Sequence, residues 1–290
     1  MEQEGLISAA LFVSALRGAT PLILAAMGGF LSERSGTVQI GLEGMMLAGA
    51  LAGATHAHFH HAPWVSFFVA GCAGMLLAFL LAIFVISIRI DQIVAGAALN
   101  MLAFGIAPFV TKQLFDSTGS TPSLPLESRF TFGPIVVSIA VAVLITFWYR
   151  QTRSGLLLRF AGERPEALAA AGYKPQMVKW WGLLGCGFLA GLGGGSLSLF
   201  LSSSYSPSMT GGRGFIALAA LIFGRWKPFP TMCACLFFAF VDAIQMRLQG
   251  QETGIPIQFI QILPYLVTII ALAGFFGKSR APQALGQRPQ

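Results

Sequence analysis

Three polar side chains stand inside stretches of sequence that are otherwise apolar, and their types and spacing suit the binding of a small solute. Gln39 and Glu43 lie in "VQIGLEGMMLAGA", and Asn100 ends "DQIVAGAALN". Polar groups at membrane depth are costly and usually face a cavity or a partner. Gly41 and Gly44 would let a helix break beside Glu43, and broken helices offer backbone groups to a solute. We interpret Gln39, Glu43 and Asn100 as lining a substrate pathway.

The alternative for these three residues is plain hydrogen bonding between helices, which is the other common use of polar side chains within a membrane. Pro108 lies two turns after Asn100 and predicts a second break in the same segment. Both interpretations place the three residues on membrane-spanning helices that are bent or interrupted.

Catalytic and metal-binding patterns are missing from the sequence. It holds no Gly-x-Ser-x-Gly, no His-Glu-x-x-His and no Gly-x-x-x-x-Gly-Lys-Ser/Thr phosphate loop. The imidazoles of "HAHFHH" (56–61) alternate, but no carboxylate or thiol stands near them. The four cysteines lie in apolar runs and are interpreted as small apolar residues. We therefore predict no catalytic residue, no metal site, no cofactor and no ATPase site in this chain.

The composition predicts the elements that position the polar residues. Only 10% of the 290 residues are charged, 55% are hydrophobic, and the mean hydropathy is +0.73. A helix needs about 20 apolar residues to cross a bilayer. The sequence therefore predicts an all-α, polytopic transmembrane bundle of about eight to ten segments, some of them broken helices. The expected spans are roughly 6–30, 38–57, 63–88, 92–115, 134–149, 178–200, 214–224, 229–249 and 260–277.

The seventh of these spans is too short to cross alone, so we expect a half-helix or part of a longer broken element. Residues 1–278 form one transmembrane domain with a polar loop at 150–178. Residues 279–290 form a short polar tail that we expect to be frayed.

The positive charges predict the orientation. Loops rich in Lys and Arg stay in the cytoplasm, and the loop 150–178 is the densest basic stretch of the chain. Alternation from that loop places the N-terminus outside and the C-terminal tail in the cytoplasm. The net charge of +7 then belongs to cytoplasmic loops and indicates no nucleic acid partner.

A glycine stripe predicts where helices pack most closely. Gly187, Gly191 and Gly195 recur every four residues on one helix face, and Gly49 and Gly53 repeat that spacing. Because glycine has no side chain, another helix can approach its backbone closely at such a face.

A short helix is predicted in the basic loop, within "ERPEALAAAGYKP". Pro165 suits a first turn, and Glu163 and Glu166 stand at the positive end of the helix dipole. Gly172 can take the left-handed conformation that closes a helix. The sequence thus specifies about two turns from Glu163 to Gly172. The alternative interpretation is a surface helix that merely joins two spans.

The same stretch resembles a known motif. "EALAAAG" (166–172) is similar to the EAA motif of ABC importer permeases, with Leu168 in place of the second alanine. The blocks 19–50, 91–100, 188–199 and 212–228 also resemble permeases of the branched-chain amino acid, simple-sugar and nucleoside importer group. The closest likeness is to nucleoside-type permeases that work with basic-membrane-protein lipoproteins. Gln39 stands where that group would have Asn.

The resemblance implies a function and a set of partners. The chain would be the permease subunit of a bacterial ABC importer, multi-pass in the inner (plasma) membrane. It would move a small polar solute, a nucleoside or next a simple sugar, by ATP-driven alternating access. Its partners would be an ATPase subunit that binds the ATP, a second permease subunit and an outer substrate-binding lipoprotein. The coupling helix that docks on the ATPase would use Glu163, Arg164, Pro165, Glu166 and Gly172.

A stand-alone secondary transporter or channel is the alternative. Such a protein needs a titratable or ion-coordinating cluster in the membrane. In this chain Glu43, Asp91 and Asp242 are scattered along the sequence.

Overall fold

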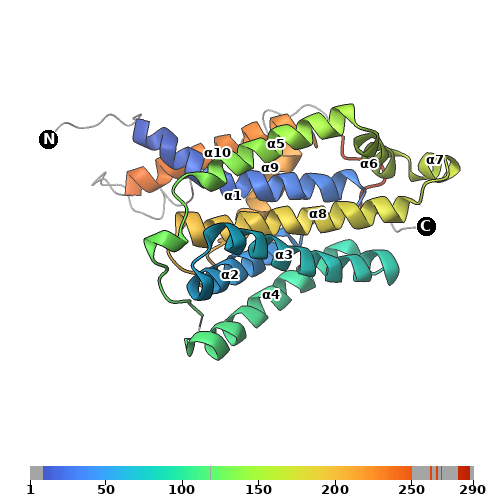
Figure 1. Cartoon of the computed structure of the whole chain (residues 1–290). Helices are drawn as coiled ribbons and strands as arrows, with labels where there is room; N and C mark the ends of the chain where they lie inside the picture. The colour runs from blue at the N-terminus through green and yellow to red at the C-terminus, as the bar shows by residue number, and fades with distance from the viewer. Residues whose placement is uncertain are drawn as a thin grey trace.

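The computed structural model describes residues 9–117, 119–249 and 280–287, together with the isolated positions 262, 266 and 269. Every regular element in these ranges is helical (Figure 1), and the predicted all-α fold is confirmed. The long helices are α1 Ala9–Arg34, α2 Leu42–His60, α3 Pro63–Ala82, α4 Gln92–Phe115, α5 Gly133–Gln151, α8 Pro175–Ser196 and α10 Pro228–Gln249. The short ones are α6 Arg153–Glu163, α7 Pro165–Ala170 and α9 Arg213–Phe223.

Single turns of other helix types extend two of these helices and interrupt one loop. They are the π turns Ile83–Ser87 after α3 and Leu197–Leu201 after α8, and the 3-10 turn Leu126–Ser128. Within the described part of the chain, six helical segments are long and apolar enough to cross a membrane. α2 has 19 residues and packs among them. The predicted span 260–277 lies outside the described residues apart from the three isolated positions.

The breaks in the bundle differ in part from those predicted. α9 has only 11 residues, so the expected half-helix is present. Pro108, however, does not break its segment, because α4 continues through it to Phe115. A proline removes one backbone donor, and a membrane helix tolerates that loss where neighbouring groups compensate. The real interruption is the non-helical stretch 35–41 between α1 and α2, called the hinge below.

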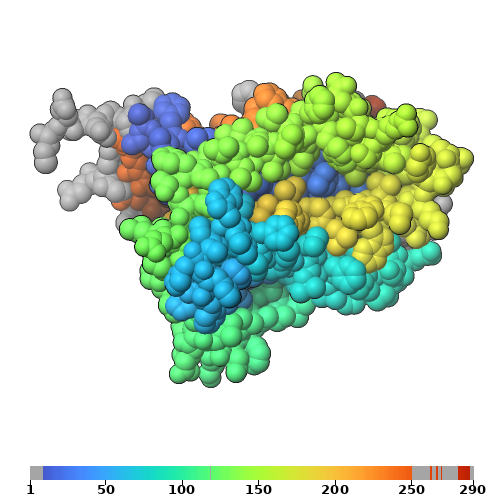
Figure 2. All heavy atoms as spheres, viewed as in Figure 1, coloured from blue at the N-terminus to red at the C-terminus, as the bar shows by residue number. Residues whose placement is uncertain are grey.

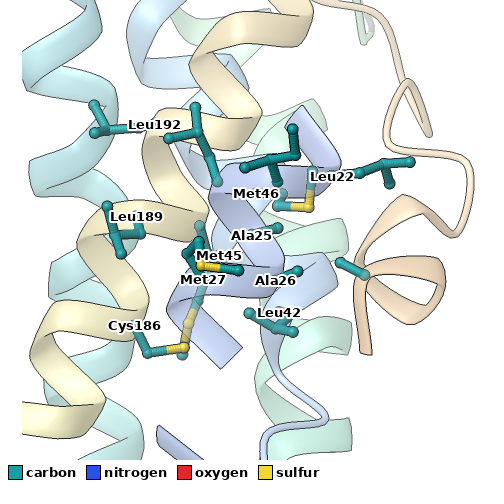
Figure 3. Packing of buried hydrophobic residues seen from close by; sticks show 14 of the residues in the cluster. Leu22, Ala25, Ala26, Met27, Leu42, Met45, Met46, Cys186, Leu189 and Leu192 are labelled. Carbon is teal, nitrogen blue, oxygen red and sulfur yellow. The ribbon is translucent and has the colours of Figure 1, made fainter. Parts of the chain in front are cut away.

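The core forms where α1, α2, α3 and α8 meet. Figure 3 shows side chains of α1 (Leu22, Met27), α2 (Met45) and α8 (Cys186, Leu189) converging on one another. All of these except Leu189 are almost completely buried. Such apolar interdigitation holds the elements that carry the polar residues.

The glycines of α8 lie against the backbones of two other helices. A Cβ atom at Gly191 would collide with the carbonyl oxygen of Ala70 on α3, and one at Gly49 on α2 would collide with Gly191 itself. A Cβ at Gly187 would meet Gly74 and Ala78, and one at Gly195 would lie 2.6 Å from the Cβ of Ala70. The three helices therefore touch backbone to backbone along this stripe.

The loops gather at two opposite ends of the bundle. At one end residues 119–132 pair with the chain after α8, where the backbone N–H of Thr121 donates to the Tyr205 carbonyl at 3.1 Å. At the other end stand α6 and α7 (Figure 1). We call this second end the α7 end.

The C-terminal segment 280–287 also lies at the α7 end. The backbone N–H of Ala284 donates to Gly162 at 2.8 Å, and the side chain of Gln92 donates to the Gln287 carbonyl at 3.2 Å. Ala284 is 2% exposed. The expectation of a frayed tail is therefore wrong for these residues, because a short turn (Pro282–Leu285) lets small apolar side chains reach the bundle.

Candidate functional site

The hinge and the start of α2 bring the three predicted pathway residues together. Gln39, Glu43 and Asn100 are each less than a tenth exposed. Two come from the hinge and the first turn of α2, and Asn100 reaches them from the middle of α4. The site is thus the junction where the hinge, the start of α2 and the continuous helix α4 meet, although a break at Pro108 was expected in α4.

Glu43 joins α2 to the beginning of α9. Its two carboxylate oxygens accept from the backbone N–H groups of Gly212 at 2.8 Å and Gly214 at 2.7 Å. The first N–H groups of a helix lack partners within the helix, and its dipole favours a negative charge there. Glu43 therefore caps the half-helix α9 from another helix.

Asn100 fastens α4 to the same junction. Its side-chain oxygen accepts from the backbone N–H of Gly44 at 2.8 Å, and its amide nitrogen donates to the Ile40 carbonyl at 3.0 Å. The Ile40 carbonyl belongs to the hinge, and the Gly44 N–H lies in the first turn of α2, where backbone donors have no helical partner. Gly44 permits this approach, because a Cβ on it would lie 2.9 Å from the Asn100 oxygen.

Gln39 is fully buried inside the hinge. Its amide nitrogen lies 3.2 Å from the sulfur of Met45 and 3.1 Å from that of Cys186. Its side-chain oxygen has no hydrogen-bond partner among the described residues. In this conformation the polar groups of Glu43 and Asn100 are hydrogen-bonded to neighbouring elements. The side-chain oxygen of Gln39 accepts no hydrogen bond from the described residues.

Two further residues, which hydropathy alone does not single out, complete the junction. The carboxylate of Glu33, in the last turn of α1, accepts from the indole N–H of Trp226 at 2.6 Å and from the backbone N–H of Gln39 at 3.4 Å. Glu33 is 3% exposed and Trp226 is 7% exposed. A tryptophan and a glutamate in short basic turns give little sign that they will be buried together.

The predicted helix in the basic loop is shorter than expected and has a companion. α7 runs from Pro165 to Ala170, whereas Glu163 is the last residue of a separate helix, α6. Arg164 between them has an extended φ of −146°, because a residue before proline is pushed away from helical geometry. The prediction of one helix from Glu163 to Gly172 is therefore wrong at its start.

The far end of α7 has the geometry that the sequence implied. Gly172 has a φ of +84°, and the N–H of Tyr173 returns to the Leu168 carbonyl at 3.2 Å. Leu168 is 3% exposed, while Glu166 and the alanines around it face outward. α7 projects beyond the rest of the bundle (Figure 1).

Glu163 makes an ion pair at the base of this projection. Its carboxylate lies 3.0 Å from the Arg34 guanidinium at the end of α1. The side chain predicted to reach outward to a partner thus contacts α1 in this conformation.

A cavity of about 370 Å³ lies beside α7, under the C-terminal segment. It is bounded by Glu166, Tyr173, Lys174, Lys179, Ala284 and Gln287, among others. α7 and the segment 280–287 thus share one surface.

A second cavity of about 490 Å³ lies between α2, α3 and α4, where Figure 2 shows the molecule hollowed above α4. Its lining is mostly aliphatic, with His56 and His60 stacked at a centroid distance of 4.5 Å. Across the described ranges, His, Cys, Asp and Glu do not gather in groups of three or more that could hold a metal ion.

Comparison with known proteins gives one family. Residues 11–272 match the family model described as branched-chain amino acid transport system / permease component. The chain is 36% identical over 294 residues to the guanosine ABC transporter permease protein NupQ of Bacillus subtilis, with 92% of each chain covered. It is also 36% identical to the nucleoside ABC transporter permease protein NupC of Lactococcus lactis, again with 92% of each covered. The putative glucose ABC transporter permease protein TsgC13 of Haloferax volcanii is 30% identical, with 92% of this chain and 91% of that protein covered.

Proposed function

Since the chain belongs to the permease family of the branched-chain amino acid transport systems and is the permease subunit of an ABC importer, we propose that its solute is a nucleoside. The observation that carries this proposal is the 36% identity, over nearly the whole chain, to permeases named for guanosine and for nucleosides. A simple sugar is the second candidate, because a relative named for glucose is 30% identical.

The solute is tested by uptake of labelled guanosine into cells that express the complete transporter. We expect unlabelled nucleosides to compete with the label and glucose to have no effect. Uptake of labelled glucose by the same cells, with no uptake of labelled guanosine, would replace the first candidate with the second.

The ATPase subunit docks on α7, which acts as the coupling helix. α7 begins at Pro165 and is closed by Gly172, which has a left-handed conformation. It exposes Glu166 and Ala169. A short, stiff projection of this kind fits a groove and transmits a displacement better than a flexible loop would. Arg164, Pro165, Glu166 and Gly172 shape this surface, and Glu163 anchors it to α1.

ATP is bound by the partner subunits, which close on it and push the coupling helices together. Because ATP binds the closed pair more tightly, it shifts the permease toward the outward-open state. A second permease subunit, alike or identical, faces this one across the pathway, and an outer lipoprotein delivers the solute. Gln39, Glu43 and Asn100 border the pathway at the junction.

The coupling role is tested by two substitutions at one position. The space around Gly172 is open, so only the backbone conformation decides what the position accepts. Asparagine tolerates the left-handed region, whereas a β-branched residue there costs about 1–3 kcal/mol. We expect Gly172→Val to lose binding of the ATPase in co-purification and to lose transport, and Gly172→Asn to keep both. Equal behaviour of the two variants would make α7 a mere connector.

The α7 end faces the cytoplasm in this proposal, with the N-terminus outside and the C-terminus inside. The support is the concentration of Lys and Arg in the segment 150–179. A cysteine at exposed Ala170 should be labelled only from the cytoplasmic side, and one at exposed Ser120 only from outside. The reverse pattern would overturn the orientation.

A further inference from the structure

The half-helix α9 is held at both of its ends by a glutamate from the region of the hinge. Glu43, just after the hinge, accepts from Gly212 and Gly214 at the start of α9. Glu33, just before the hinge, accepts from Trp226 in the turn that follows α9. The hinge and α9 are therefore connected twice, and a displacement of one has a direct route to the other.

The turn after α9 is strained. Arg225 and Trp226 are consecutive non-glycine residues in the left-handed region, with φ of 53° and 52°. Such a conformation persists only where the surroundings enforce it, and it is concentrated at functional sites. Here the indole of Trp226 is packed with Phe30, Tyr149 and Leu158, and its N–H points to Glu33.

Arg34, the next residue after Glu33, makes a contact in another direction. Its guanidinium pairs with Glu163 at 3.0 Å and lies over the ring of Tyr149, 5.4 Å from its centroid. Its carbonyl oxygen lies so close to Gly162 that any Cβ at that glycine would collide with it. Glu163 closes α6 and is followed after one residue by Pro165, the start of α7.

Two adjacent residues of α1 thus connect the coupling helix to the half-helix at the pathway. We propose that Glu33 and Arg34 are positioning residues that pass the displacement of α7 to α9. Arg34 moves with the base of α7 because it is paired with Glu163. Glu33 then displaces Trp226, and with it the end of α9. This role rests on the proposed docking of the ATPase at α7.

Loss of a relay contact and loss of a contact that only supports the fold would change different measured quantities. A structural contact affects assembly and stability, and transport then falls in proportion to the amount of intact complex. A relay contact leaves assembly and ATP hydrolysis in place and lowers the amount of solute moved for each ATP hydrolysed. That ratio is the decisive measurement.

The first test removes only the indole N–H. Trp226→Phe keeps an aromatic ring in the cluster with Tyr149 and loses the bond to Glu33. In the complete transporter, reconstituted into vesicles, we expect the solute moved per ATP to fall by roughly threefold to tenfold. Trp181→Phe is the matched control, because Trp181 is 68% exposed and should leave the ratio unchanged.

The second test uses a conservative variant of Glu33. Glu33→Gln retains a side-chain oxygen that can accept from the indole, whereas Glu33→Leu does not. We expect Glu33→Gln to keep most of the coupling ratio and Glu33→Leu to lose it as Trp226→Phe does.

The third test exchanges the charges of the ion pair. Arg34→Glu and Glu163→Arg should each lower the solute moved per ATP, and the double variant should recover at least half of the loss. The proposal is overturned if Trp226→Phe and both single charge variants assemble and retain the normal ratio. It is equally overturned if hydrolysis and transport fall together, because the contacts are then only structural.

The outcome at Gly172 separates this inference from the proposed function. If Gly172→Val still assembles with the ATPase, the docking at α7 is wrong. If Gly172→Val loses the ATPase while Trp226→Phe and both single charge variants couple normally, the docking stands and the relay fails.

Discussion

The glycine stripe of α8 and the junction at Glu43 hold helices together in opposite ways. Along the stripe, Gly187 and Gly191 bring α8 so close to α3 that backbone meets backbone. At the junction, α2, α4 and α9 meet through the side chains of Glu43 and Asn100, which bond to backbone groups left open by breaks in the helices. Shape alone determines the first contact, and a few directed hydrogen bonds determine the second.

This difference indicates which part of the permease is able to move. A backbone contact without side chains has one favourable arrangement, because packed interiors leave no room for sliding. A capped half-helix has discrete alternatives, since its N–H groups can exchange one acceptor for another. We therefore regard α3 and α8, with the part of α2 near Gly49, as the rigid body, and α9 with the hinge as the moving part.

The largest effect is expected where the rigid body loses its close approach. Gly191→Ala places a methyl group against the Ala70 carbonyl and should destabilise the folded permease by about 3 kcal/mol, the upper end of overpacking costs. Gly105→Ala is the matched control, because nothing lies within 4 Å of a Cβ there. The measurement is the thermal midpoint of the purified permease in detergent. Equal midpoints for the two variants would refute the rigid-body interpretation.

The next effect is expected at the cap of α9. Glu43→Ala leaves the N–H groups of Gly212 and Gly214 without their acceptor in a buried site, which costs about 1–3 kcal/mol. Transport should be lost, while membrane insertion and ATPase binding remain. Glu43→Gln keeps one acceptor oxygen and should be intermediate. Full transport by Glu43→Ala would show that α9 needs no cap and would remove Glu43 from the moving part.

A smaller effect is expected at Asn100. Asn100→Ala removes two neutral hydrogen bonds, one accepted from the Gly44 N–H and one donated to the Ile40 carbonyl. Each contributes about 1 kcal/mol to stability. Asn100→Asp keeps the acceptor for Gly44 but places a second oxygen against the Ile40 carbonyl, so it should transport no better than Asn100→Ala. The check is the initial rate of uptake at equal amounts of assembled complex. Identical rates for both variants and the unchanged chain would make Asn100 a bystander.

The burial of three polar side chains at one place was easier to predict from the sequence than the groups they contact. Gln39, Glu43 and Asn100 are recognisable because each is a polar residue within an apolar run. The partners of Glu43 are not recognisable, because Gly212 lies 169 positions away and hydropathy carries no information about which helices meet. The same reason hides the contact of Glu33 with Trp226, whose two residues lie in separate basic turns.

Breaks and ends of helices were predictable only where local chemistry fixes them. Gly172 closes α7 because glycine accepts a positive φ, and Pro165 opens it. That same proline excludes Arg164 from helical geometry, so a boundary after Glu163 is encoded locally in the sequence. Pro108 predicts a break, but α4 continues through it because the surrounding bundle stabilises the helix. The docking of residues 280–287 has no local signal, because it depends on a site formed by the hinge, α4 and α6.

The smallest effect is expected from a polar contact that lies inside the rigid body. The hydroxyl of Ser198 donates to the Ala50 carbonyl at 2.8 Å, which links the π turn that extends α8 to α2. Ala50 stands in the interior of α2, where the helical pattern already supplies its carbonyl with a backbone donor. Ser198→Ala therefore leaves no group unpaired and should cost about 0.6 kcal/mol, the average for hydrogen bonds between membrane helices. Thermal midpoint and uptake should both stay close to those of the unchanged chain. A loss as large as that of Asn100→Ala would mean that directed bonds also determine the rigid body, and the contrast between the two regions would fail.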